Sequence, residues 1–190
     1  MKLGKFALVA VSLIAAVFIS GCIGQGTPTT TTTTQQAVDG YYTYESQLYG
    51  VRMKYPAEWA KAENYMSTIA YFSSGSSGTE DTFAESVSIS TEVLPNSTVT
   101  VGQYTDSALE LIGKMYNNFT LIASTDMSVG SLPAHQVVYT ITQGVYEFKI
   151  LQVFAIVENE AYVITYTAES KNYAMYVGIA DEMIQSFELI

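Results

Sequence analysis

Apolar and polar residues alternate with a period of two over most of the chain beyond residue 40. Residues 49–55 alternate until Pro56, which lacks a backbone donor and predicts the end of a strand. In residues 85–94, Val87 and Ile89 share one side with Thr91, and serines occupy the other side. Further strands are predicted over residues 68–72, 119–126, 134–142, 145–157 and 161–168, with a hairpin turn at 158–160. The pattern indicates long antiparallel strands.

The period changes to that of a helix after residue 99. Thr100 and Gln103 have the spacing of a capping box, which predicts a helix that begins there and runs to about Tyr116. Its apolar stripe comprises Tyr104, Ala108, Leu111, Ile112 and Met115.

A second helix is predicted near the end of the chain, with Ser170 as its cap. Its apolar stripe comprises Tyr176, Ala180, Met183, Ile184 and Phe187. Antiparallel strands interrupted by two amphipathic helices predict an α+β sandwich.

The first residues have a different character and predict an export signal. Lys2 and Lys5 precede the apolar residues 6–19, and small residues lead into Cys22, the only cysteine. Residues 19–22, Ile-Ser-Gly-Cys, resemble the lipobox of prokaryotic lipoproteins, which implies cleavage after residue 21 and a lipid on Cys22. Residues 6–23 are also just long enough for an uncleaved membrane anchor, and a plain secretory signal is the third alternative. All three place the rest of the chain on the extracytoplasmic side of the cell membrane.

Residues 22–40 separate this segment from the predicted domain at residues 41–190. They are small and polar and include six consecutive threonines, a composition that cannot bury enough apolar area to fold. Fully extended, residues 24–38 would reach on the order of 50 Å. We expect a flexible stalk that holds one domain away from the membrane.

The charge of the chain excludes one class of partner. Removal of residues 1–21 takes away two lysines and no acid, so Lys and Arg fall from 8 to 6 against 18 acidic residues, a formal charge of −12. Such a surface repels nucleic acid, and no basic stripe interrupts it. A single cysteine also excludes an intramolecular disulfide.

Several short motifs resemble the PsbP family and its Mog1-like relatives. Residues 49–59 (YGVRMKYPAEW) resemble the opening strand of that family, and residues 101–112 its central helix. Residues 134–139 and 184–187 are similar to its later strand and closing helix. The resemblance implies an antiparallel sheet of about six strands with helices packed on both faces. It also implies an accessory role, since members include the extrinsic photosystem II subunit and many prokaryotic lipoproteins.

Candidate chemistry in the domain is sparse. His135 is the only histidine, and no serine or cysteine nucleophile motif lies near it, so a structural or surface role is the simpler interpretation. Acidic residues at 80, 81 and 85, or at 181 and 182, offer oxygen atoms for Ca²⁺, but without EF-hand spacing they are better explained as solvated carboxylates. We therefore expect no catalytic residue, metal or cofactor.

Two further features suggest surface roles. Asn96 and Asn118 begin sequons for N-glycosylation. The chain has 15 tyrosines, most of which sheet packing explains, while Tyr162 and Tyr166 could form an exposed platform for a sugar or a peptide.

These observations lead to one functional expectation and one alternative. The first is a surface-tethered lipoprotein whose non-enzymatic domain binds, assembles or stabilises a membrane-associated or cell-envelope partner, either a protein or a glycan. The alternative is an extracytoplasmic small-ligand carrier or hydrolase with a site near His135.

Overall fold

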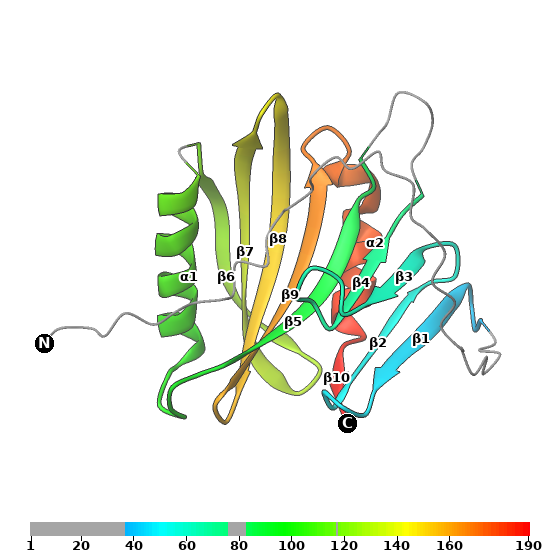
Figure 1. Cartoon of the computed structure of the whole chain (residues 1–190), viewed down its shortest axis with the longest axis horizontal. Helices are drawn as coiled ribbons and strands as arrows, with labels where there is room; N and C mark the ends of the chain where they lie inside the picture. Colours follow the sequence, from blue (N-terminus) through cyan, green and yellow to red (C-terminus); the bar gives the residue numbers. More distant parts are fainter. Residues whose placement is uncertain (1–36, 76–82, 117) are drawn as a thin grey trace, which may run out of the picture.

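The computed structural model describes residues 37–75, 83–116 and 118–190, which form two antiparallel sheets and two helices (Figure 1). The larger sheet has seven strands in the order β3 (Ala60–Glu63), β4 (Ala70–Ser73), β5 (Ser86–Val93), β9 (Glu160–Glu169), β8 (Tyr146–Val157), β7 (Leu132–Gln143) and β6 (Thr120–Val129). The smaller sheet comprises β1 (Tyr41–Ser46), β2 (Val51–Pro56) and β10 (Glu188–Leu189) in the order β1-β2-β10.

The elements form three layers around the larger sheet. Helix α1 (Val101–Met115) covers β7 and β8 on one face, where Ile112 packs in a cluster with Tyr139 and Ile150. The other face carries helix α2 (Tyr173–Gln185) together with the smaller sheet. The expected α+β class is confirmed, but the strands number seven and three rather than about six, and a sheet shares the second face with its helix.

Helix α1 begins where the capping box predicted. The Thr100 hydroxyl accepts from the Gln103 amide at 3.2 Å, and the Gln103 side chain accepts from the Thr100 amide at 3.0 Å. These bonds satisfy two backbone donors that a helix start leaves free. Of the predicted stripe, Met115 remains half exposed.

Helix α2 begins two residues later than predicted, with Asn172 rather than Ser170 as its N-cap. Strand β9 continues to Glu169, and the Ser170 amide still donates to the carbonyl of Glu147 at 2.9 Å. This bond ties Ser170 to the sheet, so the helix starts after it.

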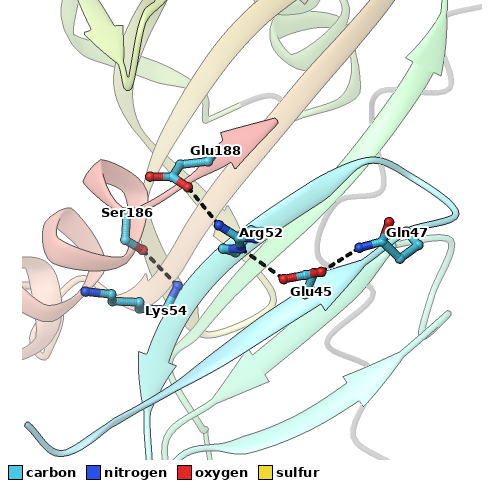
Figure 2. A network of polar contacts seen from close by, with 6 residues as sticks. All are labelled: Glu45, Gln47, Arg52, Lys54, Ser186 and Glu188. Atoms are coloured by element: carbon cyan, nitrogen blue, oxygen red, sulfur yellow. Dashed lines mark hydrogen bonds and ion pairs between the residues drawn. The ribbon is translucent and has the colours of Figure 1, made fainter. Parts of the chain in front are cut away.

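The pattern of apolar residues did not reveal strands β1, β3 and β10. They are short, and β10 has only two residues. Figure 2 shows how side chains join two of them: Arg52 on β2 contacts Glu45 of β1 at 3.0 Å and Glu188 of β10 at 3.4 Å. The small sheet thus joins the start of the domain to its end.

Candidate functional site

The only histidine is the middle member of a hydrogen-bonded chain of three polar side chains. Strands β6 and β7 pair with Asp126 opposite His135, and Ser124 lies two residues before Asp126 on the same side of β6. His135 Nε2 lies 2.7 Å from the Ser124 Oγ, and its Nδ1 lies 2.7 Å from the Asp126 Oδ1. We call these three residues the His135 network.

The sequence did not reveal Ser124 as a neighbour of His135. The two residues are 11 positions apart, and only the register of the β6–β7 hairpin brings them together. One pattern in the sequence could have indicated the contact: Ser and Asp two positions apart on one predicted strand, with a histidine on the next. No nucleophile motif lies near His135 along the chain, and Ser124 is its neighbour only in space.

The order of contacts in the network matches that of a serine nucleophile, a histidine base and an orienting carboxylate. A carboxylate on Nδ1 orients the ring and leaves Nε2 facing the hydroxyl. The surroundings are different from those of a buried triad, because the Asp126 side chain is 92% exposed. Water weakens the electrostatic contribution of such a carboxylate.

A concave cavity of about 430 Å³ lies at another position, beside the start of α1. Its lining includes Glu92, Asp106 and Glu110, and it contains no lysine, arginine or histidine. The Tyr104 hydroxyl donates to Glu92 at 2.9 Å, and burial, followed by the charge of Glu92, raises the pKa of Tyr104 well above its usual value. The wall of this cavity is therefore acidic, and the His135 network lies outside it.

Both predicted glycosylation sequons have exposed asparagines. Asn96 lies at the cavity, where its Oδ1 accepts from the Thr98 amide at 3.0 Å and from the Thr98 hydroxyl at 2.6 Å. Asn118 lies between α1 and β6. Modification of either residue stays a prediction.

The predicted recognition surface of Tyr162 and Tyr166 is wrong, because both side chains are buried. They lie on the face of β9 that α2 covers, where the Tyr166 hydroxyl donates to the carbonyl of Tyr173 at 2.9 Å. The ring of Tyr162 packs near Phe187, with 6.0 Å between centroids. Strand alternation had placed the two tyrosines on one face correctly, but that face is the core.

Other predicted features fall partly outside the described residues, which exclude Cys22, the stalk as far as residue 36, and the acidic residues at 80 and 81. Glu85 is buried and accepts from the Asn172 side chain at 3.0 Å. Among residues 37–75, 83–116 and 118–190, no group of three His, Cys, Asp or Glu could hold a metal ion. Neither helix in those ranges has the length and apolar character needed to cross a membrane.

The three-layer fold, with helix α1 on one face and a helix plus a small sheet on the other, defines the class of domain. A family described as PsbP-like protein matches residues 7–189, so this chain belongs to the PsbP-like family. No curated protein sequence matches it.

Three solved structures share the fold at low sequence identity. Cyanobacterial PsbP from Synechocystis sp. PCC 6803 is 11% identical, with a TM-score of 0.61 over 81% of this chain and 95% of that one. Mycobacterium tuberculosis LpqN, described as involved in cell envelope biogenesis, is 10% identical, with a TM-score of 0.57 over 73% and 82%. Pseudomonas aeruginosa PA94 is 16% identical, with a TM-score of 0.56 over 77% and 94%.

Proposed function

We propose that this protein is a lipid-anchored, extracytoplasmic binding factor. Its PsbP-like domain holds, assembles or stabilises a membrane-associated or cell-envelope partner and performs no catalysis. The observation that carries the proposal is the extent of the family match, which begins at residue 7 inside the apolar run. The match therefore takes in the lipobox-like residues 19–22 together with the domain.

The order of the parts along the chain supports the same function. Cys22 precedes the Thr-rich residues, and the first strand of the domain begins at Tyr41. A lipid on Cys22 and an extended stalk would place the domain tens of ångströms from the bilayer. The envelope role in the description of LpqN, a structural neighbour, is consistent with a partner in the cell envelope.

The first test is replacement of Cys22 by serine. A hydroxyl at this position cannot form the thioether of a lipoprotein, so we expect Cys22→Ser to lose its lipid. The variant should leave the membrane fraction or accumulate uncleaved. Cell fractionation and intact-mass measurement of wild type and variant would show this difference.

A matched control is Ser20→Ala, which keeps a small residue in the lipobox and should still be processed. Wild-type protein with an intact N-terminus, or with a mature terminus at a residue other than 22, would contradict the lipoprotein assignment.

The His135 network supports a second candidate function, an extracytoplasmic hydrolase. In such a reaction the Ser124 oxygen would attack an ester carbonyl while His135 Nε2 takes the hydroxyl proton. The ester C–O bond would then break as His135 returns that proton to the leaving alcohol, and water would hydrolyse the acyl-serine. The 2.7 Å contacts on both ring nitrogens favour this candidate. The high exposure of Asp126 and the position of the cavity beside α1 favour the binding factor instead.

A fluorophosphonate probe, which labels activated serines, separates the two candidates. For a binding factor we expect no more labelling of wild type than of Ser124→Ala, and His135→Gln should change the free energy of unfolding by less than about 1.5 kcal/mol. Labelling of Ser124 that disappears in a folded His135→Gln variant would establish the hydrolase.

A further inference from the structure

Strand β6 forms a long open edge of the seven-stranded sheet. It has ten residues and pairs on one side with β7, and among the described residues no strand pairs with its other side. In Figure 1 it borders the sheet on the side away from the smaller sheet. Backbone donors and acceptors therefore line this edge, available to another extended chain.

The first seven residues of β6, from Thr120 to Asp126, are poorly covered on both faces. All seven are exposed, and among them Leu121 is 42% and Ile122 is 51% exposed. Helix α1 packs on β7 and β8, and α2 packs on β9 and β2. A strand added beside β6 would find apolar side chains as well as backbone groups.

The opposite edge of the same sheet has features that discourage pairing. Strand β3 has four residues, and Lys61 and Glu63 on it form an ion pair at 2.5 Å. Short length and edge lysines are common devices against edge-to-edge association. Strand β6 has no lysine, arginine or proline, and its one irregularity is a bulge between Leu121 and Ala123. The seven residues from 123 to 129 pair with β7 without interruption.

The formal charge of the β6–β7 hairpin is negative. Residues 120–143, the β6–β7 hairpin, contain one acid, Asp126, and one histidine, which is already bound to that acid. The Asp126 side chain is 92% exposed, and the whole chain carries a formal charge of −10. A second copy of the chain would bring a like charge to the edge, whereas a basic segment would be attracted to it.

We propose that β6 binds an extended, basic segment of a partner polypeptide as an added antiparallel strand. Backbone hydrogen bonds supply most of the affinity in this mode of recognition, and alternate side chains supply the specificity. The partner's lysines or arginines pair with Asp126, and its apolar residues pack on Leu121 and Ile122. The proposal rests on the binding function proposed above and names the class of partner.

The probes for the test are two synthetic ten-residue peptides. One alternates lysine with valine and threonine, and the other has glutamate in place of lysine. With the full chain in detergent, we expect the lysine peptide to bind at least about tenfold more tightly at low salt, and the difference to shrink at high salt. Amide hydrogen exchange of β6 should slow when the lysine peptide binds.

Three variants make the test specific. Asp126→Lys should reverse the preference between the two peptides. Alternate residues of β6 direct their backbone amides towards β7 and away from it, so the amides of residues 125 and 128 point to opposite sides. One of the two variants Thr125→Pro and Ser128→Pro therefore removes an outward amide and leaves the pairing with β7 intact. That variant, recognised by an unchanged melting temperature, should lose binding at least about tenfold.

Three results would overturn the proposal: no binding of the lysine peptide at millimolar concentration, exchange protection that maps away from β6, or unchanged binding in both folded proline variants. Self-association of the protein through β6, detected by sedimentation and blocked by the same variants, would also overturn it in favour of a second copy. None of these results depends on Cys22, so the lipoprotein assignment is tested separately.

Discussion

Replacing Tyr166 by alanine is expected to lower the free energy of unfolding by about 3–5 kcal/mol, the range for a large aromatic side chain in a core. The side chain of Tyr166 is completely buried in the middle of the larger sheet. Its ring lies 5.2 Å from that of Tyr173, and its hydroxyl donates to the Tyr173 carbonyl at 2.9 Å. The substitution removes the ring and leaves a cavity beneath α2.

Two control variants, measured by denaturant unfolding, separate the effect of the buried ring from those of an exposed ring and of the hydroxyl. Tyr65→Ala removes a tyrosine that is 43% exposed and should lower the free energy of unfolding by less than about 1 kcal/mol. Tyr166→Phe removes only the hydroxyl and should lower it by about 0.5–1.5 kcal/mol. A Tyr166→Ala protein as stable as Tyr65→Ala would show that Tyr166 is not a core residue.

Raising the pH above about 10 is expected to unfold the domain. Burial raises the pKa of Tyr173 to about 12, and the hydrogen bond to Glu182 raises the pKa of Tyr41 to about 12. Burial raises the pKa values of Tyr104, Tyr139 and Tyr166 still further.

Stability falls with rising pH because the folded and unfolded states bind different numbers of protons. In the unfolded chain a tyrosine loses its proton near pH 10, while in the folded chain these tyrosines keep theirs, so the folded state binds more protons above pH 10. The stability they contribute is fully present below pH 10 and is lost as the pH rises towards their folded pKa values. Each buried tyrosine lowers the free energy of unfolding by about 1.4 kcal/mol per pH unit, so three of them lower it by about 4 kcal/mol per unit.

Circular dichroism and the ultraviolet absorbance of tyrosinate, recorded over the same pH series, measure unfolding and ionisation together. We expect the buried tyrosines to ionise in the same step as the domain unfolds, above pH 10. Tyr139→Phe removes one buried titrating group and should make the dependence of stability on pH less steep. Ionisation of all 15 tyrosines near pH 10 in a domain that stays folded would contradict the prediction.

The contacts of the candidate site depend on which face of a strand is covered and on how two strands are aligned. Strand alternation indicated that Tyr162 and Tyr166 share a face, but it carries no information about which face another element covers. For the His135 network, Ser124 and Asp126 lie on one strand and His135 on the next, and their contacts depend on the exact register of the hairpin. Register is a property of paired strands, so a single strand does not reveal it.

The sequence by itself determined the elements whose signals are local. The capping box of α1, the strands with period-two alternation and the end of β2 at Pro56 each follow from backbone chemistry within a few residues. Only the tertiary structure decided the features that depend on distant contacts. These include β10, which pairs with β2 across more than 130 positions, the open edge at β6, and the start of α2 after Ser170 has bonded to β8. The physical reason is that a short strand is stable only when a partner supplies its hydrogen bonds and covers a face.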